Sequence, residues 1–198
     1  GSIWSDTTGL WHTAFYPYTS KEAASLDPTL VSCKYFDIEF EDFSKLDKWE
    51  DIPTPYFDSV LKYQDYEEDV MKWMYILGGR LCFELNELDK WQVIPFLKGI
   101  ARSGKSTLIT KVFRKFYEVD DIKTLSNNVE KKFGLSSIHD ALMYIAPEIK
   151  GDLQLEQAEF QSIVSGEEVS IAVKCEKAKN FVWKVPGILG GNEVPQWK

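Results

Sequence analysis

The sequence has few of the residues that build common metal sites and nucleophile sites. Its three cysteines, Cys33, Cys82 and Cys175, are widely separated and form no Cys-x-x-Cys pair. Its two histidines, His12 and His139, stand far apart and have no serine, cysteine or aspartate pattern beside them. A zinc site and a Ser-His-Asp hydrolase are therefore not expected, and the cysteines are read as buried free thiols in a reducing compartment.

Long apolar runs and a basic surplus are also missing. No segment approaches the roughly 18 uninterrupted apolar residues that a membrane-spanning helix needs, so we expect no membrane partner. The formal net charge is -8, but residues 1–98 hold 18 acidic and 9 basic side chains, whereas residues 99–198 hold 13 and 14. Because a few well-placed lysines can contact a phosphate backbone, this overall acidity does not exclude DNA.

The two halves of the chain differ in hydrophobic pattern. From Phe57 to Leu77 apolar residues recur at three- and four-residue spacing, which predicts helices, and Gly78-Gly79 ends that segment. A second apolar segment, Leu81–Leu88, follows. We therefore predict a mainly helical N-terminal region over residues 1–90, although residues 1–29 show no clear pattern.

From Trp91 onward, short apolar runs alternate with helical patterns. Trp91–Leu97 fits a buried strand, Gly99–Gly104 a turn, and Ser106–Tyr117 a helix. A further helix is expected at 154–164, and further strands at 142–146, 169–173, 181–185 and 187–189. This alternation predicts an α/β domain over residues 91–198.

The turn after the first strand matches the phosphate-binding pattern G-x-x-x-x-G-K-[ST] without a mismatch. The matching residues are Gly99, Ile100, Ala101, Arg102, Ser103, Gly104, Lys105 and Ser106, and Thr107 follows them. Glycines let the backbone curl so that its N–H groups point toward phosphate, while Lys105 would reach the β- and γ-phosphates and the Ser106 hydroxyl would bind Mg²⁺. ATP and Mg²⁺ are therefore the expected cofactors.

Three downstream features bear on the reaction. Glu148 follows an apolar run and would stand at the carboxyl end of a buried strand, where it could organise Mg²⁺ or polarise water; an ordinary exposed glutamate is the alternative. Asn192 closes a short strand and could orient water or sense the γ-phosphate; a simple turn residue is the alternative. The lysines of an expected hairpin tip could contact DNA, although a solvated turn is the commoner meaning. These lysines are Lys174, Lys177 and Lys179.

In this order, the segments resemble the superfamily 3 helicases, in particular the primase-helicases of poxviruses and other large nucleocytoplasmic DNA viruses. The match comprises GIARSGKST as motif A, YIAPEI as motif B, FQSIVSGEEVSIAVK as motif B-prime and GILGGNEVP as motif C. The segment from Pro55 to Leu97, with its Gly79-Arg80-Leu81 and Asp89–Val93 stretches, is similar to the helical region that precedes the ATPase in those proteins. That part of the resemblance is less diagnostic.

The resemblance implies a P-loop NTPase (AAA+-like) sheet with helices on both faces, preceded by a helical collar. It implies an ATP-driven ring, usually a hexamer, that unwinds DNA during viral replication inside the host cell, in the cytoplasm or the nucleus. On this view Lys105 contacts phosphates, Ser106 and Glu148 bind Mg²⁺, Asn192 acts as the sensor, and the hairpin lysines face DNA.

The sequence departs from the helicase pattern in two ways. Many relatives carry adjacent acids in motif B, whereas Pro147 precedes Glu148 here and Asp152 is the next acid, so the division between metal binding and water positioning stays open. The family also places an arginine finger beyond motif C, worth about 10³ to 10⁵ in rate. Since the sequence stops at Lys198, we expect this chain to bind ATP but to hydrolyse it poorly.

Two other functions remain open at this point. A P-loop kinase acting on a small molecule would need a compact acceptor site, and no residues stand out for one. A nucleotide-binding factor that assists assembly without hydrolysis would agree with the missing finger. Hydrolysis stimulated by DNA would separate the helicase from both.

Overall fold

The computed structural model describes residues 2–5, 11–14, 43, 45–125, 135–151, 156–171 and 178–195. The chain divides into two compact units, Gly1–Lys72 and Trp73–Lys198.

The first unit contains a two-stranded antiparallel sheet. β1 (Ser2–Ser5) pairs with β2 (Trp11–Ala14), with Ser2 opposite Ala14. These strands fall in residues 1–29, where the sequence shows no clear pattern. The expected mainly helical region therefore also contains β-structure.

Helices make up most of the described chain from residue 49 to residue 80. A short 3₁₀ helix, η1 (Trp49–Asp51), precedes α2 (Pro55–Tyr63), and α3 (Glu68–Arg80) spans the boundary between the two units. Proline at the first position of α2 and Asp58 in its first turn both favour a helix N-terminus. The helices predicted between Phe57 and Leu77 are confirmed. Gly78-Gly79 do not end the segment as expected, because α3 continues through them to Arg80.

Leu81–Leu88, an apolar segment of the region expected to be mainly helical, forms turns and no helix. Asn86 has a left-handed backbone with φ of 65°, which no α-helix accommodates. The Leu85 N–H donates to the carbonyl of Lys184 at 2.8 Å, and the Asn86 side chain donates to the carbonyl of Ser165 at 2.9 Å. Tertiary hydrogen bonds replace the local ones that a helix would make.

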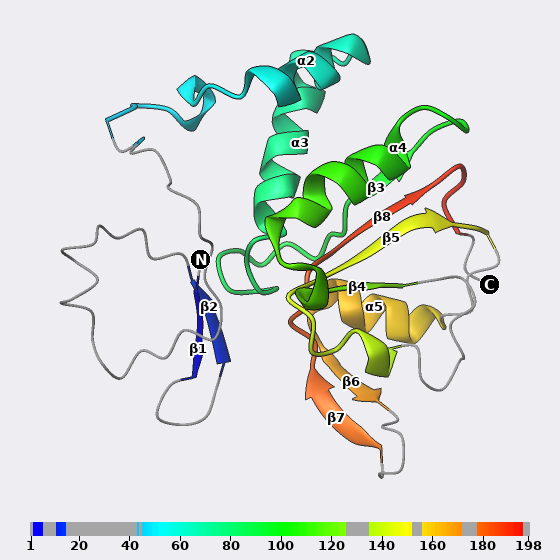
Figure 1. Ribbon diagram of the computed structural model, residues 1–198. Coiled ribbons are helices and arrows are strands. Elements are labelled where there is room, and N and C mark those ends of the chain that lie inside the picture. Colours follow the sequence, from blue (N-terminus) through cyan, green and yellow to red (C-terminus); the bar gives the residue numbers. More distant parts are fainter. Residues whose placement is uncertain are drawn as a thin grey trace. The chain divides into compact units, whose positions relative to one another are not determined.

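The second unit is built on a four-stranded parallel sheet with the order β3-β8-β5-β4 (Figure 1). The strands are β3 (Phe96–Lys98), β4 (Ile122–Thr124), β5 (Met143–Ile149) and β8 (Gly187–Gly191). The predicted α/β architecture is therefore confirmed as a mixed α/β unit with a parallel sheet.

The first sheet strand starts later than expected. The predicted strand covered Trp91–Leu97, but β3 begins only at Phe96. The carbonyl groups of Trp91 and Val93 accept hydrogen bonds from the Arg80 guanidinium at 3.0 and 3.3 Å. These two carbonyl groups therefore accept hydrogen bonds from a side chain and not from the backbone of a neighbouring strand.

A helical segment follows β3 and the glycine turn, as predicted. It starts as α4 (Lys105–Thr107), continues with π-type bonding in η2 (Leu108–Val112) and ends as the 3₁₀ helix η3 (Phe113–Phe116). Short 3₁₀ helices η4 (Val119–Asp121) and η5 (Leu135–Ser137) lie on either side of residues 126–134.

The remaining elements also follow the predicted order. α5 (Gln157–Ser165) corresponds to the helix expected at 154–164, and Gly166 ends it in a left-handed conformation with φ of 73°. β6 (Glu168–Ile171) and β7 (Lys179–Val182) pair antiparallel, which agrees with the two strands expected there.

Helical segments cover the two faces of the parallel sheet (Figure 1). Ala146 and Leu189 belong to the same buried cluster as Ile163 of α5, so their side chains share one face. Gly190 follows Leu189 and therefore points the other way, where the fully buried Ile109 of η2 packs against it.

Candidate nucleotide-binding edge of the sheet

The turn between β3 and α4 is tightly curled. Gly104, just before the helix, has φ of 88°, and Arg102 also lies in the left-handed region with φ of 66°. A Cβ atom at Gly99 would stand 2.9 Å from the Ser103 hydroxyl oxygen, so a side chain there would displace Ser103. Gly104 is thus required by the backbone path of the predicted phosphate loop, and Gly99 leaves room for the Ser103 side chain.

Lys105 folds back over this loop. Its ammonium nitrogen Nζ donates to the carbonyl oxygen of Ile100 at 2.6 Å and to the hydroxyl oxygen of Ser103 at 3.2 Å. Ile100 itself is 81% exposed, and Ala101 and Arg102 are exposed as well. The middle of the loop is therefore exposed to solvent, and the Lys105 ammonium group lies against the loop's own carbonyl and hydroxyl groups.

Ser106 connects the loop to β5. Its hydroxyl donates to the carbonyl oxygen of Pro147 at 3.1 Å, and Thr107 is exposed beside it in the same first turn. Pro147 directly precedes Glu148, which is exposed near the carboxyl end of β5. The structure thus brings Ser106 next to the segment that carries the predicted acid.

Asn192 lies at the same edge. It is exposed and immediately follows β8, whose last residue, Gly191, is aligned with Lys98 of β3 and with Ile149 of β5. The Gly99 N–H donates to the Gly191 carbonyl at 3.4 Å. Because β3, β5 and β8 are parallel, the loop, Glu148 and Asn192 all lie at the carboxyl ends of adjacent strands, where open α/β sheets bind ligands.

Residues 97–198 match a protein-family model described as "Family of unknown function (DUF5906)". The chain belongs to this family. The matched segment starts inside β3 and includes the glycine loop, Glu148 and Asn192.

Solved structures that resemble the chain include two of the C-terminal region of NrS-1. "The A form apo structure of NrS-1 C terminal region-CTR" aligns with a TM-score of 0.51 and 16% identity over 72% of this chain and 34% of that one. "The A form apo structure of NrS-1 C terminal region-CTR(305-718)" aligns with a TM-score of 0.48 and 16% identity over 96% of this chain and 53% of that one. At this identity the likeness extends to the fold alone, and the chain spans only part of either structure. No curated protein matches the sequence.

The predicted DNA-contacting lysines lie partly outside the described residues. Lys174 and Lys177 fall there, whereas Lys179 opens β7, is exposed, and is paired with Ile171 of β6. The DUF5906 segment thus includes the antiparallel strand pair on which these lysines were expected.

The donors available for Mg²⁺ are few. In the described residues no group of three or more His, Cys, Asp or Glu side chains could hold a metal ion. Mg²⁺ is usually bound through one or two protein oxygens together with substrate phosphates and water. The hydroxyl of Ser106 and the carboxylate of Glu148 therefore fit Mg²⁺ only as partners of a bound nucleotide.

Cys82 is a free thiol, as expected, and burial raises its pKa to about 11. Cys33 and Cys175 lie outside the described residues. None of the described helices is long and apolar enough to cross a lipid bilayer.

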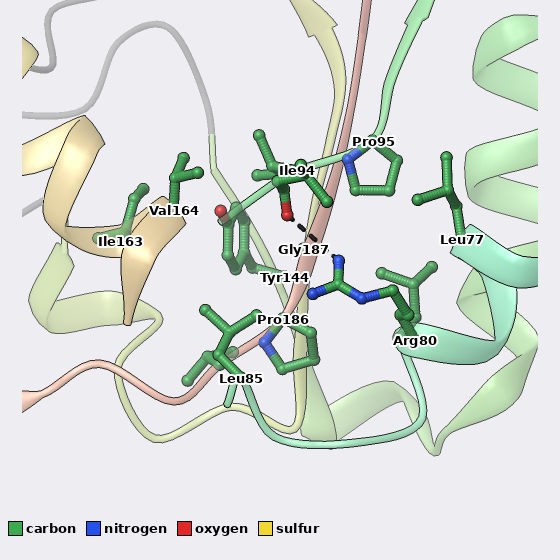
Figure 2. A pocket seen from close by; sticks show the side chains of 13 residues that line it. Leu77, Arg80, Leu85, Ile94, Pro95, Tyr144, Ile163, Val164, Pro186 and Gly187 are labelled. Atoms are coloured by element: carbon green, nitrogen blue, oxygen red, sulfur yellow. Dashed lines mark hydrogen bonds between the residues drawn. The ribbon is translucent and has the colours of Figure 1, made fainter. Parts of the chain in front are cut away.

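A small hollow lies at the opposite edge of the sheet (Figure 2). Its lining includes Tyr144 and Gly187, at the amino ends of β5 and β8, and Pro95 just before β3. It has room for about one water molecule. The Tyr144 hydroxyl is buried and finds no hydrogen-bond partner in the described part of the chain, and burial raises the pKa of this phenol.

Arg80, which also lines this hollow, organises the approach to β3 and was not predicted as a functional residue. Its guanidinium binds the Asp89 carboxylate through two bonds, Nε to Oδ2 at 2.7 Å and Nη2 to Oδ1 at 2.9 Å. This hydrogen bonding lowers the pKa of Asp89. The guanidinium also lies 5.6 Å from the ring centroid of Trp91, which in turn stacks at a tilt against Trp73.

Arg80 and Asp89 are nine positions apart in the sequence, and this spacing matches no helix or strand period. The stretches that contain them, Gly79-Arg80-Leu81 and Asp89–Val93, stand out in the sequence only through the resemblance to the helicases. Residue type and spacing alone therefore did not predict the ion pair between Arg80 and Asp89.

Proposed function

We propose that the chain carries the ATP-dependent DNA helicase core of a viral replication primase-helicase. The observation that supports this best is the meeting of three motif segments at one edge: the glycine loop after β3, Glu148 of β5 and Asn192 after β8. The order of the superfamily 3 motifs along the sequence supports the same proposal.

The loop suits a nucleotide phosphate chain. Lys105 donates to the Ile100 carbonyl of the loop at 2.6 Å, so its ammonium group lies against the glycine loop. In the nucleotide complex, phosphate oxygens would replace Ile100 and Ser103 as its acceptors. Charge-assisted hydrogen bonds of this kind are about twice as strong as neutral ones. Lys105 would thereby hold the β- and γ-phosphates.

The two edge residues would act on the γ-phosphate. The exposed carboxylate of Glu148 would accept a proton from, or orient, the attacking water, and the Asn192 amide would donate to a γ-phosphate oxygen. Bound Mg²⁺ would neutralise charge on the β- and γ-oxygens, and the donors for it are Ser106 and Glu148.

The partners belong to the same proposal. Lys179, with Lys174 and Lys177, would contact the DNA backbone, and copies of the chain would associate into a ring, usually hexameric. Such an assembly would work inside the host cell, in the cytoplasm or the nucleus.

The test is ATP hydrolysis with and without single-stranded DNA, compared between the parent chain and Lys105→Ala. Lys111→Ala is the matched control, because Lys111 is an exposed lysine on the same helical segment. As the sequence leads us to expect poor hydrolysis, we expect a low rate that DNA raises, that Lys105→Ala abolishes and that Lys111→Ala leaves unchanged.

Other outcomes would overturn the helicase proposal. Phosphate transfer to a small acceptor that is insensitive to DNA would identify a kinase. Nucleotide binding that requires Lys105 but never leads to turnover, even with DNA, would identify an assembly factor.

A further inference from the structure

β5 contains one extra residue near its carboxyl end. Ala146 pairs with Leu189 and Ile149 pairs with Gly191, so two residues of β5, Pro147 and Glu148, stand opposite the single Gly190 of β8. This is a β-bulge, and proline suits it because proline has no N–H to donate to a ladder.

The bulge decides which side chain enters the core. Residues two apart in a strand share a face, so a regular β5 would place Glu148 beside Ala146 in the apolar cluster that contains Ile163. With the extra residue, Ile149 takes that place and is only 3% exposed, while Glu148 is exposed at the edge. Because of the bulge, the Glu148 carboxylate avoids the free-energy cost of burial among apolar side chains.

The bulge also turns the Pro147 carbonyl out of the sheet. In a regular strand this oxygen would lie in the sheet plane and accept an N–H from a neighbouring strand. Here it accepts the Ser106 hydroxyl at 3.1 Å. It also stands 3.2 Å from the position that a Cβ atom of Gly190 would occupy, which places it on the face covered by Ile109.

We propose that Pro147 is a positioning residue of the nucleotide site, an inference that rests on the proposed function. Its carbonyl holds the Ser106 hydroxyl in the orientation that meets Mg²⁺, and its bulge presents Glu148 to the same place. A neutral backbone oxygen therefore contacts Ser106 at the position where many relatives carry the first of two adjacent acids. Glu148 is left as the single carboxylate of motif B.

The experiment titrates Mg²⁺ into the full chain with a fluorescent ATP analogue and compares Pro147→Ala with the parent. The alanine restores a backbone N–H that competes for a place in the ladder. Outer-shell groups that orient a ligand typically contribute about 10-fold to 100-fold to metal affinity. We expect the Mg²⁺ concentration at half-maximal binding to rise about 10-fold, within that range, while analogue binding in EDTA is unchanged.

A double-variant cycle separates positioning from a general structural effect. If Pro147 acts partly through Ser106, Pro147→Ala will have a smaller effect in the Ser106→Ala background, where only its effect on Glu148 remains. Ser106→Thr, which keeps the hydroxyl, will respond to Pro147→Ala as the parent does. Pro53→Ala, at an exposed proline, controls for the chemical change itself. The same cycle on urea midpoints without nucleotide reports the hydroxyl-to-carbonyl bond directly.

An unchanged Mg²⁺ midpoint in Pro147→Ala, or effects of the two substitutions that simply multiply, would overturn the inference. Failure of the proposed function has a different signature: analogue binding would be absent or equal in the parent and Lys105→Ala. The nucleotide-free cycle would then still report whether Ser106 and Pro147 are coupled.

Discussion

Ile109 packs so closely against Gly190 that a Cβ atom added to the glycine would stand 2.7 Å from the Ile109 Cδ1 atom. This contact sets how near the helix that follows the glycine loop can approach the sheet. It therefore ties the packing of the core to the position of Ser106.

We predict that Gly190→Ala lowers the free energy of unfolding by about 1–3 kcal/mol, because the added methyl group overpacks a filled site. Urea denaturation measures the change. Gly79→Ala is the control: nothing lies within 4 Å of its Cβ position and it is helical, so a gain of up to about 1 kcal/mol is expected. Equal stabilities for Gly190→Ala and the parent would contradict the packing argument.

Tyr144→Phe is expected to stabilise the protein by about 1 kcal/mol, since it removes a buried hydroxyl that has no partner among the described residues while keeping the ring that packs against Trp183. Thermal and urea unfolding would show the gain. Tyr63→Phe, at a tyrosine that is 87% exposed, should change nothing. A loss of stability in Tyr144→Phe would mean that the hydroxyl is hydrogen-bonded.

The Arg80–Asp89 pair predicts a pH dependence. The hydrogen bond from Arg80 lowers the folded-state pKa of Asp89 below its unfolded value, so its contribution is fully present above the unfolded pKa, near 4, and is lost as pH falls through the folded pKa. The Asp89 side chain is 31% exposed, so solvent screening limits the contribution to about 1 kcal/mol.

Asp89→Asn should therefore destabilise the protein at pH 7, and the difference from the parent should shrink as the pH falls below about 4. Unfolding curves across this range test the prediction, with Asp47→Asn, at an exposed aspartate, as the control. A difference that stays constant with pH would show that the pair does not titrate as described.

Arg102 adopts a left-handed backbone in the glycine loop, with φ of 66°. A non-glycine residue is strained there by roughly 1–2 kcal/mol, and a β-branched residue by more. Arg102→Val should thus lose stability while Arg102→Gly keeps or gains it, as measured by urea midpoints. The reverse order would show that the loop adopts a different backbone in solution.

The sequence predicted those parts of the fold and of the candidate site that depend on local pattern. The strand, glycine loop and helix around Lys105 follow from periodicity and glycine spacing, and the apolar runs placed Glu148 and Asn192 at strand ends. Their arrival at one edge required only that the strands be parallel.

The parts that were not predicted depend on tertiary contacts. Leu81–Leu88 has a helix-like apolar content, but long-range bonds from Leu85 and Asn86 hold it in turns. The bulge at Pro147 depends on the competition between Glu148 and Ile149 for one core position, which no single-strand pattern contains. Sequence reasoning treated Pro147 only as a departure from a motif, whereas in the structure its carbonyl accepts a hydrogen bond from the Ser106 hydroxyl.

The placement of β8 between β3 and β5 has a consequence for tolerance to mutation. β3 and β5 share no ladder with each other, and both are hydrogen-bonded to β8. In this five-residue strand Gly187, Gly190 and Gly191 are buried. An added side chain at Gly190 or Gly191 would collide with atoms of other elements, Ile109 at the first and the Ile149 carbonyl at the second. In a library of all single substitutions, we therefore expect Gly190 and Gly191 to be among the positions where substitution most reduces stability, although neither carries a reactive side chain. The absence of side chains lets neighbouring elements approach β8 closely.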